Sequence, residues 1–427
     1  MPDKLMHPVS SLRGEVDLPG DKSISHRALI LSAISNGDCH VTGLSQAQDV
    51  NSTARCLSDL GVTLEPQEGA TQVHGVGMTG LKEPDHELDA GNSGTTMRLL
   101  SGVLAAQPYI TTITGDESLR KRPMRRIIEP LELMGAQIES AEYKAPLKIW
   151  GHSLRAIDYA SPLSSAQVKS CILLAGLYAK GLTRVTEPHS SRDHTERMLQ
   201  EMGVNVHYSA AMAAVKGPVE LQAHDIDVPG DISAAAFFLV AAALLPDSEI
   251  VMPNVGVNDS RTGILDAMTA MGATFVLDQT EEVNYEPRTR IIARSSKLSG
   301  TMLSGAMIPR IIDEIPILAI AATQADGVTT IKDAGELRVK ESDRLSAIAE
   351  NLKRMGAQVR ELKDGLVITG PTPLKSAEID SFGDHRIAMA FSVAALIADG
   401  DTTIKDIDCV NVSFPNFYDK LESVIHD

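Results

Sequence analysis

The sequence predicts an α/β protein of two domains, each built from three βαβαββ repeats whose sheets wrap around buried helices. Three observations predict this fold class. A helix-ending phrase recurs along the chain, a strand phrase that carries Asp recurs with similar spacing, and Ala-rich apolar segments follow the Asp phrases. A chain of 427 residues is also long for a single hydrophobic core, which favours two domains.

The helix-ending phrase marks the amphipathic helix of each repeat. Each copy ends in Gly, which suits the left-handed C-cap of a helix, and the copies recur at intervals of roughly 70 residues. These glycines are Gly61, Gly135, Gly203, Gly272 and Gly356. The Asp phrases contain Asp17, Asp89, Asp158, Asp227 and Asp380. With one degenerate copy, the two series predict about six repeats.

The Ala-rich segments are expected to be the buried helices. Segments such as 232–246 and 385–400 are apolar on nearly all faces, and a helix of that kind belongs in a core. Small Ala side chains allow several such helices to pack closely. Short β-branched strands follow these segments, for example 328–334. Each repeat is therefore expected to place its sheet outside and one helix inside.

The ends of the chain predict a discontinuous domain. The last repeat lacks its final strands, and spare strand-like residues precede the first repeat. We therefore expect residues 20–230 to form one domain and residues 1–19 plus 231–427 to form the other. The crossovers should lie near 18–21 and 228–231, where a Pro-Gly-Asp turn recurs. The two turns are read as hinges, although ordinary strand-to-helix turns explain them equally well.

Composition excludes several classes of function. A formal net charge of −17 opposes nucleic acid or an anionic membrane as a general partner, but a small anionic substrate needs only a local cluster of cations. Four widely spaced cysteines and no signal-peptide pattern indicate reduced thiols in a cytoplasmic protein, without a zinc site. The GxGxxG match at 75–80 is not followed by a helix, so a dinucleotide site is rejected.

Polar residues gather at the expected starts of the buried helices. The starts read "GDKSISHR", "GNSGTTMR", "SPLSSAQVKS" and "GDHRIAM". Helix N-termini bind anions, although such residues are often only caps. A basic run at 120–126 is either a solvated loop or part of a site. Lys340, Glu341 and Arg344 are expected at the start of an amphipathic helix, with Lys340 and Arg344 on one face, where a surface ion-pair network is the alternative.

Together these motifs resemble the 5-enolpyruvylshikimate-3-phosphate (EPSP) synthase family. The resemblance rests on "PGDKSISHR", "GNSGTTMR", "KRPM", "SSAQVKS", "SRDHTE", "RVKESDR" and "GDHRIAM", and it covers nearly the whole chain. "SAQVKS" and "SRDHTE" are similar to the bacterial class II variant. The family fold implies two inside-out α/β barrel domains, each of three βαβαββ units with buried parallel helices, joined by two crossovers.

The resemblance implies a transferase of the shikimate pathway. Members transfer the enolpyruvyl group of phosphoenolpyruvate to the 5-hydroxyl of shikimate 3-phosphate and release phosphate through a tetrahedral adduct. No metal or organic cofactor is implied, and a cytoplasmic monomer is expected. Two phosphates and a carboxylate need cations, the hydroxyl needs a base, and C3 of phosphoenolpyruvate needs a group that gives and later removes a proton.

The resemblance also implies roles for individual residues. The expected catalytic residues are Lys22, Asp313 and Glu341. The expected ligands of shikimate 3-phosphate are Lys22, Ser23, Arg27, Ser165, Gln167, Arg192, Asp313 and Lys340. The expected ligands of phosphoenolpyruvate are Lys22, Gly94, Arg122, Gln167, Arg344, His385 and Arg386. The pocket glycine further implies that glyphosate competes with phosphoenolpyruvate. The stretches around Lys22 and Arg386 are expected to face each other across one closing cleft.

One departure and several alternatives remain. Many relatives carry a lysine where this chain has Val412, and what replaces that lysine is left unassigned. The nearest alternative is the sister enolpyruvyl transferase that acts on UDP-N-acetylglucosamine, which resembles this chain less in "SISHR" and "SAQVKS". A non-catalytic repeat scaffold and a nucleic-acid-binding protein are more distant alternatives, and the negative charge opposes the second.

Overall fold

The computed structural model describes residues 2–426, and the chain falls into two compact units. The central unit comprises Gly20–Val228 together with the short segment Val283–Glu286. The terminal unit comprises the chain up to Pro19, Pro229–Glu282 and the chain from Pro287 onward. Each unit is described here by itself.

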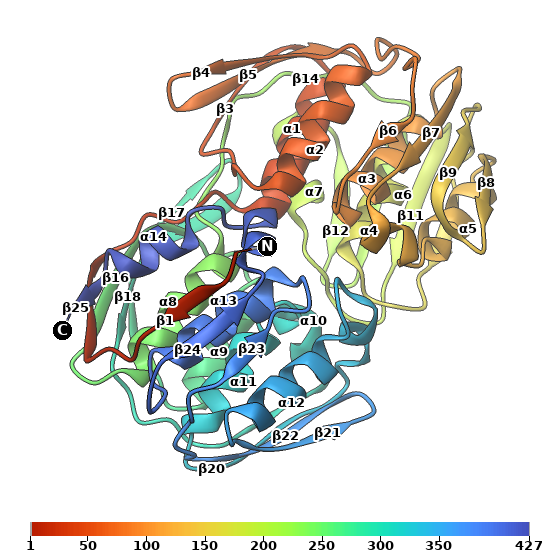
Figure 1. Ribbon diagram of the computed structural model, residues 1–427. Helices are drawn as coiled ribbons and strands as arrows, with labels where there is room; N and C mark the ends of the chain where they lie inside the picture. Colours follow the sequence, from red (N-terminus) through yellow and green to blue (C-terminus); the bar gives the residue numbers. More distant parts are fainter. Residues whose placement is uncertain (1, 427) are drawn as a thin grey trace. The chain divides into compact units, whose positions relative to one another are not determined.

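The central unit repeats one order of elements three times (Figure 1). Its helices are α1 (Lys22–Ala33), α2 (Gln48–Asp59), α3 (Gly94–Leu104), α4 (Glu117–Lys121), α5 (Arg125–Leu133), α6 (Ala166–Gly176) and α7 (His194–Glu201). Its strands are β3 (Ser35–Thr42), β4 (Thr63–Gln67), β5 (Ala70–Val76), β6 (Leu88–Asp89), β7 (Ile110–Thr114), β8 (Gln137–Ala141), β9 (Lys144–Trp150), β10 (Asp158–Ala160), β11 (Gly181–Thr186), β12 (Val206–Ser209), β13 (Met212–Gly217), β14 (Leu221–Gln222) and β15 (Ile226–Asp227).

The terminal unit uses the same order with segments from both ends of the chain. Its helices are α8 (Ile232–Leu244), α9 (Gly263–Ala270), α10 (Ile308–Ile311), α11 (Ile315–Gln324), α12 (Arg344–Arg354), α13 (His385–Ala395) and α14 (Phe417–Glu422), with 3-10 turns η1 (Gly305–Met307), η2 (Gly335–Val339) and η3 (Ile407–Val412). Its strands are β1 (Lys4–Met6), β2 (Ser11–Glu15), β16 (Glu249–Gly256), β17 (Thr274–Val283), β18 (Glu286–Arg294), β19 (Met302–Leu303), β20 (Gly327–Ile331), β21 (Gln358–Leu362), β22 (Gly365–Gly370), β23 (Glu378–Asp380), β24 (Thr402–Lys405) and β25 (Ile425–His426).

Strand pairing within a repeat follows the βαβαββ pattern. The strand before a buried helix pairs in parallel with the strand after it, as β10 does with β11 and β23 with β24. The final two strands form an antiparallel hairpin that adds to the same sheet, which gives the order β10-β11-β13-β12. Parallel pairing requires a crossover, and the buried helix supplies it. The repeat order predicted from the sequence is confirmed.

The Ala-rich helices are buried as predicted. In α8, every residue from Ile232 to Ala243 is buried, and α13 is buried over its whole length. Figure 1 shows α8, α11 and α13 enclosed by the strands of the terminal unit. The helices α1, α3 and α6 are largely buried in the central unit. Because such a helix is apolar on nearly all sides, the unpaired N–H groups at its N-terminal end are the main polar groups that it can offer to an anion.

The helix-ending glycines adopt the conformation that the repeat predicts. Gly61, Gly135, Gly203, Gly272 and Gly356 all have positive φ, between 78° and 103°. An L-residue with a side chain is strained there, so the recurring Gly is explained by the backbone that each helix end requires.

The chain crosses twice between the two units. At each crossover, the last strand before it pairs within the unit that the chain is leaving. Strand β2 pairs in parallel with β16 of the terminal unit, and the chain then enters α1 of the central unit. Strands β14 and β15 pair in parallel with β3 of the central unit before the chain enters α8. Strand β1 pairs antiparallel with β24, so N-terminal residues fill the sheet of the last repeat.

The turn between β17 and β18 belongs to the central unit although both strands run in the terminal unit. His194 Nδ1, at the start of α7, lies 2.6 Å from Glu286 Oε1, and both side chains are buried. Asn284 accepts a hydrogen bond from the Asp227 main-chain N–H through its side-chain oxygen at 2.9 Å. This turn is a connection that the repeat pattern gave no reason to expect.

Candidate active site

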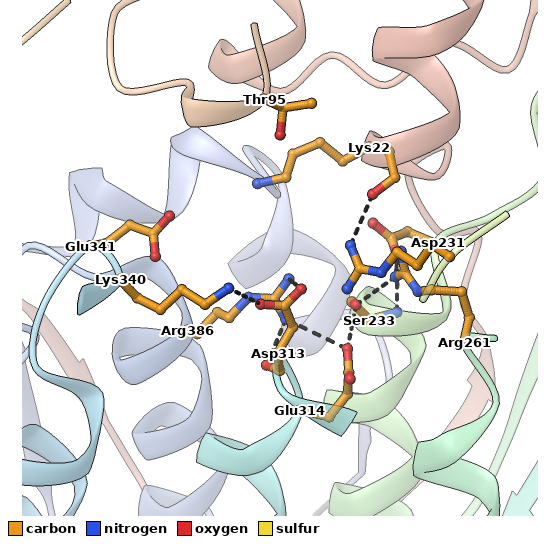
Figure 2. A network of polar contacts seen from close by, with 12 residues as sticks. Lys22, Thr95, Asp231, Ser233, Arg261, Asp313, Glu314, Lys340, Glu341 and Arg386 are labelled. Atoms are coloured by element: carbon orange, nitrogen blue, oxygen red, sulfur yellow. Dashed lines mark hydrogen bonds and ion pairs between the residues drawn. The ribbon is translucent and has the colours of Figure 1, made fainter. Parts of the chain in front are cut away.

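In the terminal unit, three cations surround the carboxylate of Asp313. Lys340 Nζ lies 3.8 Å from Asp313 Oδ1, Arg344 Nη1 lies 3.5 Å from the same oxygen, and Arg386 Nη2 lies 3.9 Å from Oδ2. Figure 2 shows Lys340 and Arg386 directed at Asp313. These residues come from the starts of three helices or the segments just before them, with Asp313 before α11, Lys340 before α12, Arg344 at the first position of α12 and Arg386 in α13. The fold therefore gathers three sequence-distant motifs at one end of the buried helices.

Arg344 is the most deeply buried of these cations, with 1% of its surface exposed. Its guanidinium donates to both carboxylate oxygens of Asp384, at 2.8 and 3.2 Å, and to Glu341 Oε2 at 2.6 Å. Burial alone disfavours its charged form, but Asp384 and Glu341 outweigh that cost and raise the pKa of Arg344. The surface ion-pair alternative is thereby excluded for Arg344.

The expectation that Lys340 and Arg344 share a helical face is wrong. Helix α12 begins at Arg344, and η2 ends at Val339, so Lys340 lies between the two elements. Asp343 caps α12 by accepting a hydrogen bond from the Ser346 main-chain N–H at 3.1 Å. This cap fixes the start of the helix after Lys340 and Glu341, which therefore extend from a non-helical segment.

The pKa values of Lys340 and Asp384 are both lowered, but for different reasons. Burial lowers the pKa of Lys340, although the nearby Asp313 carboxylate acts in the other direction. Burial favours the neutral form of Asp384, yet Arg344 prevails and holds the pKa of Asp384 below its ordinary value. Asp384 also caps α13 by accepting from the Arg386 main-chain N–H at 2.9 Å. One carboxylate thus fixes both the Arg344 side chain and the helix that carries His385 and Arg386, and His385 is buried beside them.

In the central unit, the start of α1 carries three of the expected ligands. Lys22 Nζ lies 2.9 Å from Asp49 Oδ2, and Ser23 accepts a hydrogen bond from Arg192 Nη1 at 3.1 Å. Arg27 donates to the Ser23 carbonyl at 2.9 Å. The structure therefore brings Ser23, Arg27 and Arg192 together, although Arg192 comes from a motif far away in the sequence.

The Arg27 guanidinium is held by hydroxyl groups. Its Nε donates to Thr195 Oγ1 at 2.7 Å and its Nη2 donates to Ser170 Oγ at 2.8 Å. Burial lowers the pKa of Arg27 to about 10, and the neighbouring Arg192 acts in the same direction against Glu196. Concentrated positive charge of this kind is suited to an anion.

The first turn of α3 forms a second group of ligand candidates in the central unit. A Cβ at Gly94 would lie 2.8 Å from Arg98 Nη1 and 3.5 Å from Arg122 Nη1. Arg98 donates to Gln167 Oε1 at 2.6 Å, and Gln167 donates to Thr95 Oγ1 at 2.8 Å. Gly94 and Gln167, predicted from separate motifs, therefore both lie beside Arg98, and the Arg122 guanidinium lies near Gly94 as well.

The basic run at 120–126 was expected to be either a solvated loop or part of a site, and each alternative holds for some of its residues. Arg122 is buried and donates to Asn92 Oδ1 at 2.6 Å, whereas Arg120, Lys121 and Arg125 are exposed. Arg122, the position that the family resemblance selects, is therefore the buried cation of a run whose other cations are exposed or half-buried.

Ser165 and the segment before Arg192 share a buried carboxylate. Glu187 accepts from the Ser165 main-chain N–H at 2.7 Å and from the Ser191 hydroxyl at 2.6 Å. Lys169 Nζ lies 3.3 Å from Glu187 and 2.8 Å from Glu196, and all three side chains are buried. Glu187 thus fixes the start of α6 and the loop that leads to Arg192.

Sequence reasoning missed several residues of these networks. They are Asp49, Arg98, Glu187, Arg261, Glu314 and Asp384. Arg98 and Asp384 lie inside the motifs "GNSGTTMR" and "GDHRIAM". Their presence in these motifs could have identified them as site residues. Asp49, Glu187 and Arg261 lie in segments of ordinary composition, and only tertiary packing brings them to the site.

No group of three or more His, Cys, Asp or Glu side chains within residues 2–426 is arranged to hold a metal ion. Within the same range, every helix is too short or too polar to cross a bilayer.

Comparison with known proteins gives a consistent result. Residues 6–421 match the family model described as EPSP synthase (3-phosphoshikimate 1-carboxyvinyltransferase). A 3-phosphoshikimate 1-carboxyvinyltransferase of Gloeobacter violaceus is 52% identical over 421 residues, with 98% of each chain covered. One from Bacillus cereus strain B4264 is 48% identical over 99% of this chain and 100% of its own. The solved structure of an EPSP synthase from Acinetobacter baumannii superposes with a TM-score of 0.89 at 43% identity, covering 100% of this chain and 98% of that one.

These matches span both units and confirm the predicted fold class of two inside-out α/β barrel domains. The ligand candidates described above lie within the matched range. The chain belongs to the EPSP synthase family.

Proposed function

We propose that this protein transfers the enolpyruvyl group of phosphoenolpyruvate to the 5-hydroxyl of shikimate 3-phosphate and releases phosphate. It is a 3-phosphoshikimate 1-carboxyvinyltransferase of the shikimate pathway, which leads to chorismate and the aromatic amino acids. Family membership over the whole chain supports this activity. The observation that carries it is the group of three cations around Asp313 beside Glu341, because the reaction needs cations, a base and an acid in one place.

The terminal unit supplies the acid and base groups. Arg344 and Arg386 bind the carboxylate or phosphate of phosphoenolpyruvate, since a guanidinium can make two parallel hydrogen bonds to such a group. His385 lies next to Arg386 in α13 and lines the same position. Asp313 accepts the proton of the shikimate 5-hydroxyl, and Lys340 binds shikimate 3-phosphate beside it.

The reaction proceeds by addition and elimination. Glu341 gives a proton to C3 of phosphoenolpyruvate while the 5-hydroxyl oxygen bonds to C2 and loses its proton to Asp313. The tetrahedral adduct then breaks its C2–O bond to phosphate, which leaves with the proton that Asp313 had accepted. Glu341 takes a proton back from the C3 methyl group, so both carboxyl groups return to their starting states. The products are enolpyruvylshikimate 3-phosphate and phosphate, so atoms and charge balance without a metal or an organic cofactor.

The central unit supplies further anion ligands. Ser23, Arg27 and Arg192 bind shikimate 3-phosphate, and their shared hydrogen bonds support one anion site. Ser165 is a further ligand of the same substrate. Gly94 and Arg122 bind phosphoenolpyruvate, whereas Lys22 and Gln167 contact both substrates. Lys22 also assists protonation at C3. We further propose a cytoplasmic monomer, which size-exclusion chromatography tests.

A coupled phosphate-release assay tests the proposed function. Phosphate release should require both phosphoenolpyruvate and shikimate 3-phosphate, and UDP-N-acetylglucosamine should not replace the second substrate. Release with the nucleotide sugar instead would assign the protein to the sister transferase. No release with either acceptor from folded protein would support a non-catalytic scaffold.

A further inference from the structure

A buried polar network in the terminal unit lies behind Asp313 and Arg386, and none of the roles assigned above uses it. Its members are Asp231, Ser233, Arg261 and Glu314. Glu314 and Arg261 expose 2% and 3% of their surface. Figure 2 shows these side chains connected to Asp313 and Arg386. Buried charges of this kind persist only when they are paired and hydrogen-bonded, so the network must serve stability, the site, or both.

Glu314 occupies the N-cap position of α11 but does not cap that helix. The buried helices α1, α3, α6, α8 and α13 are each capped by the side chain of their N-cap residue. In α11 the N-cap side chain makes no such hydrogen bond. The Glu314 carboxylate instead accepts a hydrogen bond from the Ser233 hydroxyl, and its Oε1 lies 3.7 Å from Arg386 Nη1. The acidic group at this helix start is directed at Arg386.

The same guanidinium nitrogen contacts the main chain next to Glu314. Arg386 Nη1 donates to the Asp313 carbonyl oxygen at 2.8 Å. The backbone of Asp313 and the side chain of Glu314 therefore hold one edge of the guanidinium. A guanidinium binds a carboxylate or phosphate well only when its plane is fixed, because both hydrogen bonds depend on that plane.

A second arginine holds Glu314 from the other side. Arg261 Nη2 donates to Ser233 Oγ at 2.8 Å and to Asp231 Oδ1 at 3.0 Å. The Ser233 hydroxyl thus accepts from Arg261 and donates to Glu314. This arrangement fixes the direction of the hydroxyl, so the Glu314 carboxylate has a defined position relative to Arg386.

We propose that Glu314, held by Ser233 and Arg261, is a positioning residue that orients Arg386 for binding phosphoenolpyruvate. The proposal rests on the phosphoenolpyruvate-binding role of Arg386 stated above. Glu314 acts through Arg386 and does not touch substrate. Its loss should weaken binding of phosphoenolpyruvate and leave binding of shikimate 3-phosphate nearly unchanged.

The test is a double-mutant cycle read out as Michaelis constants. Glu314→Gln keeps the size of the side chain but removes its charge, and it should raise KM for phosphoenolpyruvate about 10-fold. Arg386→Lys should raise the same constant because lysine lacks the planar fork. If Glu314 acts through Arg386, adding Glu314→Gln to Arg386→Lys should raise KM little further. Additive effects would overturn the proposal.

Three further variants keep the proposal falsifiable. Ser233→Ala removes the hydroxyl that donates to the Glu314 carboxylate. It should raise KM for phosphoenolpyruvate, but less than Glu314→Gln does. If Glu314→Gln does not fold, this variant provides the test. Glu314→Asp keeps the charge and should restore part of the affinity. Glu378→Gln, on the exposed part of β23, is the control and should match the unchanged protein.

The outcomes separate this proposal from the proposed function. If the unchanged protein releases no phosphate with both substrates, the proposed function fails. If Arg386→Lys leaves KM for phosphoenolpyruvate unchanged, the role assigned to Arg386 fails. The positioning role of Glu314 fails, and the role of Arg386 stands, if Arg386→Lys raises KM for phosphoenolpyruvate but Glu314→Gln does not. The same conclusion follows if Glu314→Gln raises KM for both substrates equally.

Discussion

Replacing Gly94 by alanine should weaken ligand binding without unfolding the protein. Gly94 is the first residue of α3, and it is not among the glycines with positive φ, so alanine can adopt its backbone conformation. The added Cβ would lie 2.8 Å from Arg98 Nη1. Carbon normally keeps about 3.5 Å from such an atom, so the guanidinium must withdraw by roughly 0.7 Å.

This displacement has a consequence at Gln167. The Arg98–Gln167 hydrogen bond is 2.6 Å long, and a shift of that size stretches it beyond the usual limit of about 3.2 Å. A hydrogen bond to a charged group contributes about 1.5–3 kcal/mol, so losing part of it corresponds to roughly a 10-fold weaker site. The free energy of unfolding should change by less than about 1 kcal/mol, because the displaced atom ends a flexible side chain and alanine favours the helix.

Steady-state kinetics with glyphosate as inhibitor measure the effect. Glyphosate should compete with phosphoenolpyruvate, and Gly94→Ala should raise its inhibition constant more than it raises KM for phosphoenolpyruvate. Gly102→Ala is the matched contrast on the same helix, because its Cβ would lie 2.3 Å from the Cys171 carbonyl oxygen and must destabilise the fold. Equal losses of inhibitor and substrate in Gly94→Ala, or unchanged binding of both, would refute the reasoning.

Three further predictions concern buried or reacting carboxylates. Glu341→Gln should lower kcat about 10²–10⁴-fold with the fold retained, and a phosphate-release assay checks this; undiminished turnover would remove Glu341 from the mechanism. Asp384→Asn should cost about 3–5 kcal/mol in urea unfolding, because it leaves the Arg344 charge buried without that carboxylate. The pKa of Asp384 is lower in the native state than in the unfolded state, so this stabilisation is fully present above the unfolded pKa of about 4 and is lost as the pH falls toward the native pKa. The difference in free energy of unfolding between the unchanged protein and Asp384→Asn should therefore shrink in acid. A difference that does not change with pH would contradict this. Glu187→Gln should raise KM for shikimate 3-phosphate several-fold with little change for phosphoenolpyruvate, since Glu187 holds the Ser165 main chain; an equal change in both constants would indicate a general loss of structure.

The fold class could be predicted from the sequence because the repeat marks where the amphipathic helices end and which helices are buried. Five recurring glycines predict helix ends, and all five have the left-handed backbone that a helix end requires. The Ala-rich segments predict buried helices because they are apolar on nearly all faces and so have no side suited to water. Neither inference needs knowledge of distant contacts.

The site was less accessible to such reasoning. The ligand candidates lie in motifs at helix starts, which local patterns reveal, but the groups that hold them lie elsewhere in the sequence. Asp49, Glu187 and Arg261 occupy segments with no distinguishing pattern, and packing alone brings them to Lys22, Ser165 and Ser233. The predicted start of α12 is also wrong. Among several neighbouring charged residues, the sequence did not show that Asp343 is the N-cap, which begins the helix at Arg344.

The placement of strand β2 has a consequence for how the protein is made. During synthesis, β2 leaves the ribosome long before its partners β16 and β25, which follow Gly20–Val228. Apart from the turn Val283–Glu286, the central unit lies within Gly20–Val228, and its strands β3, β14 and β15 pair inside that stretch, so most of it can fold once Val228 has emerged. The N-terminal strand must wait unpaired until β16 has followed. A slow codon or a chaperone acting after Val228 would therefore affect the terminal unit more than the central unit.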